Sequence, residues 1–183
     1  RLIHGHAEYK WETNFFREIV LGGNARFYRP NSEGTIFKDD SVKIKNSEIG
    51  FYSGLSKQFG DFIATVTGRM DKNQNFDWLF SPAASLVWKP SDNNFLRVSF
   101  SSAIRNPTLS DQYLDLEVGP ARLLGNLTGY DSLITFESFR DWRKNPIGGF
   151  DYRNIDPIRP EKVKTFEVGY RTTLFNKLYL DGS

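Results

Sequence analysis

The residues best suited to binding a ligand lie between Ile104 and Lys162, where aromatic and arginine side chains are interleaved. Aromatic rings stack on sugar rings, and guanidinium groups bind carboxylates and carbonyl groups. The candidate ligand-binding residues here are Arg105, Asn106, Tyr113, Arg140, Trp142 and Arg143. The aromatic side chains of this stretch could instead pack against one another, because so long a connection needs a small core of its own or is mobile. The sequence leaves both uses open.

A second set of candidate residues is charged and lies on the polar side of predicted strands. These residues are Arg69, Asp71, Arg97, Glu167 and Arg171. If the strands close into a barrel, these residues could form ion pairs in its interior or line a substrate path. A water-filled interior would also simply solvate them. A charge on the lipid side would cost about 2–4 kcal/mol near the membrane midplane, which supports the inward orientation.

Metal-binding residues are few. His4 and His6 point the same way from a predicted strand, but only Glu8 follows them on that side. Asp39 and Asp40 could offer oxygen ligands to calcium, yet their spacing does not match an EF-hand loop. We therefore predict no metal site and no cofactor.

Composition excludes several classes of function. The net charge of +2 gives no reason to expect a nucleic acid as partner. The absence of cysteine excludes disulfide scaffolds and thiolate metal sites. No GxSxG, P-loop or HExxH motif is present and the chain has two histidines, so we expect no enzyme. No run of eighteen apolar residues is present, so we predict no transmembrane helix.

The candidate residues are positioned by strands, because side-chain polarity alternates with period two along much of the chain. Leu96, Val98 and Phe100, for example, take one side of an extended segment, and Arg97 and Ser99 take the other. Seven such segments are predicted, and an eighth opens at Leu178. They begin near residues 2, 17, 47, 62, 80, 94 and 163.

The predicted connections alternate between short and long. Short turns are expected near 13–14, 58–61, 90–94 and 176, and long connections at 29–46, 71–79 and 104–162. An up-and-down transmembrane β-barrel has this arrangement, with short periplasmic turns and long extracellular loops. Aromatic residues flank both ends of the strands, as in the two aromatic girdles of such a barrel. A soluble β-sandwich or a lipocalin-like barrel is the alternative, because alternation alone does not say which side faces water.

Four motifs carry a family resemblance. They are "AIRNPT" at Ala103–Thr108, "GN" at Gly125–Asn126, "RPE" at Arg159–Glu161 and "EVGY" at Glu167–Tyr170. In this order they resemble the barrel of TonB-dependent outer-membrane receptors. The chain departs from the family pattern at Ile104, where an aromatic residue is common, and by an insertion between the second and third motifs. The stretch "RFYRPNSEGTIFKDDSVKIKNSEIGFYSGLSK" is similar to receptors of the Bacteroidetes type, some of them SusC-like.

The resemblance implies a barrel of about 22 strands with an N-terminal plug and a TonB box. Residues 1–183 would then be a partial barrel domain of about eight strands, without the plug. It implies a place in the bacterial outer membrane and energised uptake of a glycan, a peptide or a siderophore-like ligand. The implied partners are TonB, through the N-terminal part, outer-membrane lipid, and a SusD-like surface lipoprotein. A structural barrel subunit of a larger complex and a small closed eight-strand barrel remain as alternatives.

Overall fold

The computed structural model describes residues 1–40, 43–174 and 178–182 of the chain. They form two compact units. The sheet unit comprises Arg1–Pro30, Lys45–Asn106 and Glu161–Ser183, and the loop unit comprises Asn31–Ile44 and Pro107–Pro160.

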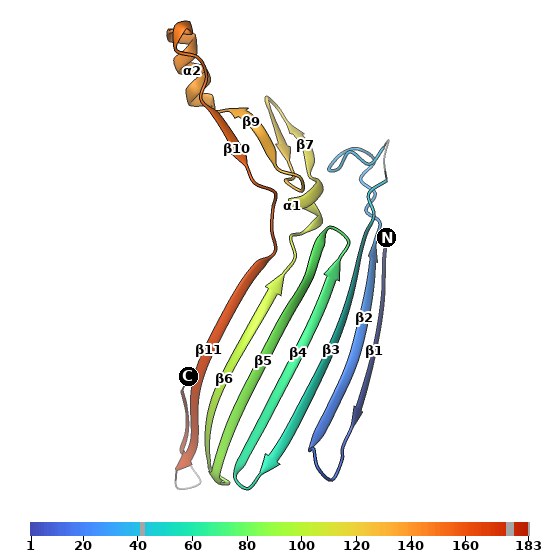
Figure 1. The fold of residues 1–183 in the computed structure, drawn as a ribbon, viewed down its shortest axis with the longest axis vertical. Coiled ribbons are helices and arrows are strands. Elements are labelled where there is room, and N and C mark those ends of the chain that lie inside the picture. The colour runs from blue at the N-terminus through green and yellow to red at the C-terminus, as the bar shows by residue number, and fades with distance from the viewer. Residues whose placement is uncertain (41–42, 175–177, 183) are drawn as a thin grey trace. The chain divides into compact units, whose positions relative to one another are not determined.

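The sheet unit is one antiparallel sheet of eight strands in the order β1-β2-β3-β4-β5-β6-β11-β12 (Figure 1). The strands are β1 (Leu2–Trp11), β2 (Glu18–Tyr28), β3 (Asn46–Phe59), β4 (Phe62–Asn73), β5 (Phe76–Ser91), β6 (Asn94–Arg105), β11 (Glu161–Leu174) and β12 (Leu178–Gly182). Each strand from β1 to β6 pairs with the strand that follows it in the chain. β6 pairs with β11 across the long connection, and β11 pairs with β12. This is the predicted up-and-down arrangement, and the prediction of an all-β fold is confirmed.

The register separates a polar side of the sheet from an apolar side, because residues directly opposite in an antiparallel pair lie on the same side. One row across the polar side contains Glu8, Gly22, Tyr52, Arg69 and Ser81. One row across the apolar side contains Trp11, Ile19, Leu55, Val66, Ala84, Phe100 and Phe166. The period-two pattern of the sequence therefore becomes two surfaces of opposite character.

The apolar surface shifts along the strands from one edge of the sheet to the other. On β1 it starts at Trp11, beside the β1–β2 turn, and continues to Ile3. On β11 it starts at Phe166 and continues in the opposite direction, toward the short-turn end of the sheet, through Val168 and Tyr170. Trp11 and Phe166 nevertheless occupy the same row of the ladder. A level apolar band on tilted strands produces this shift, and transmembrane barrel strands tilt by about 35–45°.

The two edges of the sheet are β1 and β12, and among the described residues no pairing joins them. The described part of the chain also contains no helix with the length and apolar character needed to cross a membrane.

The predicted long connection at 71–79 is wrong. β4 continues to Asn73 and β5 begins at Phe76, so only Gln74 and Asn75 lie between them. The side chain of Asn73 explains this: its Oδ1 accepts a hydrogen bond from the Asn75 amide at 2.9 Å, and its Nδ2 donates to Glu48 Oε1 at 2.9 Å. The polar composition of this stretch is typical of a loop, but its residues belong to β4 and β5. The predicted alternation of short and long connections therefore fails here.

The other connections match the prediction where they are described. Residues 29–45 join β2 to β3 and 106–160 join β6 to β11. Both join strand ends at the end of the sheet opposite to the β1–β2, β3–β4 and β5–β6 turns (Figure 1). The predicted turn at Asn176 falls outside the described residues.

The loop unit contains short elements that the sequence did not predict. They are α1 (Leu109–Tyr113), β7 (Asp115–Val118), β8 (Ala121–Leu124), β9 (Tyr130–Ile134), α2 (Phe136–Lys144), the 3₁₀ turn η1 (Pro146–Gly148) and β10 (Tyr152–Ile155). Thr108 and Asp111 form a reciprocal capping box at α1, and the Thr135 hydroxyl accepts from the Ser138 amide at α2. β7 pairs with β8 and β9 with β10.

Candidate functional site

The centre of the polar side is an ion pair between Arg69 and Asp71. Arg69 Nε donates to Asp71 Oδ2 at 2.6 Å and Nη2 donates to Oδ1 at 2.5 Å. Arg69 Nη2 also donates to Asn24 Oδ1 at 2.8 Å. Two-point contact between a guanidinium and a carboxylate fixes the orientation of both groups. The predicted residues Arg69 and Asp71 are therefore brought together.

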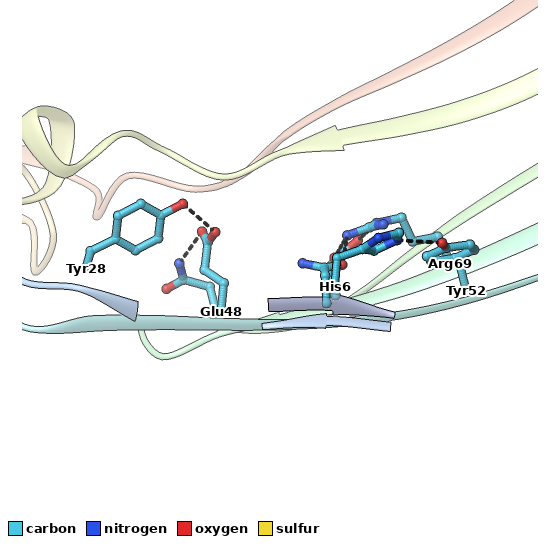
Figure 2. A network of polar contacts seen from close by, with 8 residues as sticks. His6, Tyr28, Glu48, Tyr52 and Arg69 are labelled. Atoms are coloured by element: carbon cyan, nitrogen blue, oxygen red, sulfur yellow. Dashed lines mark hydrogen bonds and ion pairs between the residues drawn. The ribbon is translucent and has the colours of Figure 1, made fainter. Parts of the chain in front are cut away.

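Tyr52 continues this network toward β1. Its hydroxyl donates to Glu8 Oε2 at 2.5 Å. The same hydroxyl lies 2.8 Å from His6 Nε2 (Figure 2). Because the hydroxyl proton is directed to Glu8, the bond with His6 requires a proton on Nε2. The guanidinium carbon of Arg69 lies 5.8 Å from the centre of the Tyr52 ring. Four strands thus contribute to one connected polar surface.

A second cluster on the same side is centred on Glu48. Its carboxylate accepts from the Tyr28 hydroxyl at 3.1 Å and from Asn73 Nδ2 at 2.9 Å (Figure 2). Asn73 is 1% exposed, so this amide is enclosed by its neighbours. Glu48 belongs to β3, and Tyr28 and Asn73 come from the two strands beside it.

Two glycines leave room for these side chains. A Cβ on Gly22 would overlap the Tyr52 ring. A Cβ on Gly50 would overlap Asp71 Oδ1, and Arg69 Nη2 and Asn24 Oδ1 lie almost as close. The polar network therefore lies directly over the bare backbone of β2 and β3.

The other predicted residues of the polar side are spread along it. Glu167 Oε2 accepts from Ser99 Oγ at 3.4 Å. The Arg171 guanidinium lies 4.9 Å from the Tyr179 ring and 5.8 Å from the Phe95 ring. Arg97 lies opposite Val87 and Gly169. These three residues share a surface with Arg69 and Asp71 but make separate contacts.

The histidines take no part in a group of metal ligands within the described residues. His6 is bonded to Tyr52, and its ring stacks on that of Tyr52 with centres 6.1 Å apart. The carboxylate of Asp39 accepts from the amides of Ser32 and Gly34 and from the Ser32 hydroxyl. These hydrogen bonds, from Gly34 first and then Ser32, lower the pKa of Asp39. Asp39 thus organises the loop between β2 and β3.

In the loop unit, aromatic side chains stack around Trp142. Its ring lies 6.1 Å from Phe139 and 4.9 Å from Phe150, and Phe150 lies 6.4 Å from Tyr152. The aromatic stretch therefore does pack against itself.

Beside this stack, a surface cavity of about 320 Å³ is lined by Phe136, Phe139, Arg140, Arg143 and Lys144. Phe136 is 78% exposed. The cavity offers apolar contact and positive charge to a ligand. Two of the predicted ligand residues, Arg140 and Arg143, therefore line the same cavity. A third, Trp142, lies in the aromatic stack.

The remaining predicted ligand residues are not among those that line this cavity. Arg105 and Asn106 belong to the sheet unit, where Arg105 Nη1 lies 4.0 Å from Glu161 Oε2. Tyr113 is the last residue of α1. The six residues predicted for the ligand therefore do not form one described cluster.

The Gly125–Asn126 motif closes the loop unit on itself. A Cβ on Gly125 would lie 2.6 Å from backbone atoms of Gln112, Tyr113 and Leu114. The Asn126 amide donates to Asp111 O at 2.8 Å, and its side chain donates to Asp156 O at 2.7 Å. The motif thus joins α1 to the segment that returns toward β11.

Comparison with known families decides between the barrel and the soluble sheet. Residues 5–183 match the family model described as TonB dependent receptor-like, beta-barrel. The chain belongs to the TonB-dependent receptor β-barrel family. This is a family of outer-membrane receptors and transporters that interact with TonB, and it is not a family of enzymes. The predictions of a TonB-dependent barrel and of an outer-membrane location are confirmed.

Sequence reasoning missed the role of Tyr52, Tyr28 and Glu48 in the polar network. Phe51 alternates with Leu55 on the apolar side of β3, so alternation alone puts the next residue, Tyr52, on the polar side. Its partners Glu8 and His6 are distant in sequence. Only the register brings them together, and alternation does not give the register.

Proposed function

We propose that this domain forms part of the wall of a TonB-dependent uptake channel and that its polar side faces the lumen. The observation that carries the proposal is the network of Arg69, Asp71, Tyr52 and Glu8, because it places hydrogen-bonding groups on one side of the sheet and leaves the other apolar. Such a surface suits contact with a plug domain or a hydrated solute. Arg97, Glu167 and Arg171 extend it.

The two edges of the sheet support a partial barrel within a larger one. In lipid, every backbone N–H and C=O needs a partner, so β1 and β12 require further strands beside them or each other. We propose that neighbouring strands and a plug are supplied by other parts of the same receptor.

The proposed cargo is a glycan or a peptide, taken up by a receptor of the SusC-like type found in Bacteroidetes, with a surface lipoprotein as partner. The surface cavity on α2 supports this choice. Phe136 and Phe139 offer aromatic surface there, and Arg140 and Arg143 offer positive charge. A siderophore-like ligand remains the second candidate, since the same cationic groups bind carboxylates.

Uptake by intact cells tests the proposal. Cells that carry the native receptor are given fluorescent oligosaccharides, fluorescent peptides or a ferric siderophore, with and without functional TonB. We expect TonB-dependent uptake of one class. R140Q/R143Q should reduce it while the receptor stays folded, whereas K38Q on the other segment of the loop unit should not. Uptake of none of the three, at normal receptor levels, would favour a structural subunit instead.

A further inference from the structure

Two lysines near the start of β11 lie on the apolar side of the sheet. Lys162 is opposite Ile104 and Lys164 is opposite Ser102, on the same side as Phe166 and Phe100. Both lysines are exposed. Their side chains leave the sheet where the strand approaches the long connection between β6 and β11.

No carboxylate shares this side of the two strands. The described residues of β6 and β11 on that side, other than the lysines, are Asn94, Leu96, Val98, Phe100, Ser102, Ile104, Phe166, Val168, Tyr170 and Thr172. The nearby ion pair between Arg105 and Glu161 lies on the polar side. The two ammonium groups therefore form a local positive charge that the sheet itself does not balance.

The shift of the apolar band places these lysines just beyond the hydrocarbon. Trp11 on β1 and Phe166 on β11 occupy one row of the ladder. On β1 the apolar band continues from this row toward the long-connection end, to Ile3. On β11 the band ends in this row, at Phe166. Lys164 and Lys162 lie about 7 and 14 Å further along the strand than Phe166, at about 3.4 Å per residue. The long-connection end of the strands is the extracellular end in barrels of this kind.

Other lysines on the apolar side already have partners. Lys57, at the short-turn end, lies 3.3 Å from the centre of the Phe15 ring. Lys72 lies 3.7 Å from Asp77 Oδ1 and donates to Phe76 O. Lys162 and Lys164 differ from these in having only apolar and hydroxyl neighbours on their side of the two strands.

We propose that Lys162 and Lys164 bind the phosphate groups of an anionic lipid in the outer leaflet of the membrane. A lysine stem can lie along apolar surface while its ammonium group reaches the headgroup level. Each lysine near a charged headgroup layer adds favourable electrostatic energy, and two on adjacent same-side positions can engage one diphosphorylated headgroup. The inference rests on the proposed orientation of the apolar side toward lipid, and it does not depend on the cargo.

Native mass spectrometry of the receptor purified from its membrane tests the site. Three probes are added in turn to the protein in neutral detergent: diphosphorylated lipid A, the same lipid without its phosphates, and inorganic phosphate. We expect wild type to bind the diphosphorylated lipid best. K162Q/K164Q should weaken that binding about tenfold or more. The control K57Q/K89Q removes the same number of charges at the short-turn end and should leave binding unchanged; Lys57 lies on the apolar side there, and Lys89 lies 5.5 Å from the Phe95 ring on the polar side.

Several outcomes overturn the inference. They are equal binding of the two lipids by wild type, equal loss in the control, and displacement of the lipid by millimolar inorganic phosphate. If K162Q/K164Q fails to fold, K162R/K164R keeps the charge and should bind as wild type does, and the wild-type comparison of the two lipids still decides. The lipid readout is independent of uptake. A failed uptake assay therefore bears on the proposed function, and retained lipid binding in K162Q/K164Q bears on this inference.

Discussion

At the scale of single residues, Asp39 determines how the β2–β3 connection folds. It is 4% exposed, and its carboxylate accepts from two backbone amides. Backbone N–H groups that point at a carboxylate favour its ionised form, which is why the pKa of Asp39 is lowered. The ionised carboxylate of Asp39 is therefore more stable in the folded loop than in the unfolded chain.

The first prediction is a loss of loop structure in acid. Because the folded pKa of Asp39 lies below the unfolded value of about 3.9, its stabilisation is complete above that value and is lost as pH falls through the folded pKa. Amide exchange of Ser32 and Gly34, corrected for intrinsic rates, should accelerate over that interval. D39N should show the same faster exchange already at neutral pH. Exchange in D39N that matched wild type would contradict this role.

The second prediction concerns Gly50 beneath the polar network. In G50A the new methyl group would meet Asp71 Oδ1 and Arg69 Nη2, which are the ends of side chains and can move. We expect the sheet to persist and the ion pair to rearrange, with a loss of about 1–3 kcal/mol. The urea midpoint of the purified protein in detergent measures this. G5A is the control, since a Cβ at Gly5 meets nothing within 4 Å.

At the scale of elements, the loop unit depends on the close approach of Gly125 to α1. Three contacts meet there: Gly125 N donates to Leu114 O, the Tyr130 hydroxyl donates to Gly125 O, and Asn126 binds Asp111 O. The third prediction is that G125A unfolds this region, because the atoms its methyl group meets are backbone and cannot move aside. Proteolysis within 107–160 should become faster, while the sheet stays resistant. G148A, where a Cβ meets nothing within 4 Å, should cleave as wild type does.

The elements also show how far sequence could predict this fold. Strands β1 to β6 follow from period-two alternation, because successive side chains in the central part of each strand point alternately to a polar and an apolar side of the sheet. The β4–β5 connection could not be predicted that way, since Asn73 is polar yet is bonded within the sheet.

The helices were missed for a related reason. α2 is nine residues long and has no buried residue, so no long apolar period marks it. Its signals are local: the Thr135 cap and the spacing of Phe136, Phe139, Arg140 and Arg143. In the sheet, alternation predicts whether a charged side chain lies on the polar or the apolar side. Which side chain it contacts depends on the register between strands, as the contacts of Tyr52 with Glu8 and His6 show.

At the scale of the whole molecule, the open edges of the sheet lead to the last prediction. β1 and β12 present unpaired backbone groups, and lipid leaves such groups without hydrogen-bond partners. Either the two edges meet each other or further strands lie beside them. We expect further strands, because a barrel of eight strands has an interior just wide enough for its own side chains and leaves no space for a plug.

The intact mass of the native protein, extracted from the outer membrane in detergent, distinguishes the two. We expect a mass several times the 21.1 kDa of this chain, together with a band on unheated gels that shifts on boiling, as a folded barrel unfolds. The control is the same extract treated with a protease that does not enter folded barrels, in which the shift should survive. A mass near 21.1 kDa would mean that β1 and β12 close on each other in a small barrel. The polar network of Arg69 and Tyr52 would then fill its narrow interior, and no plug could contact it.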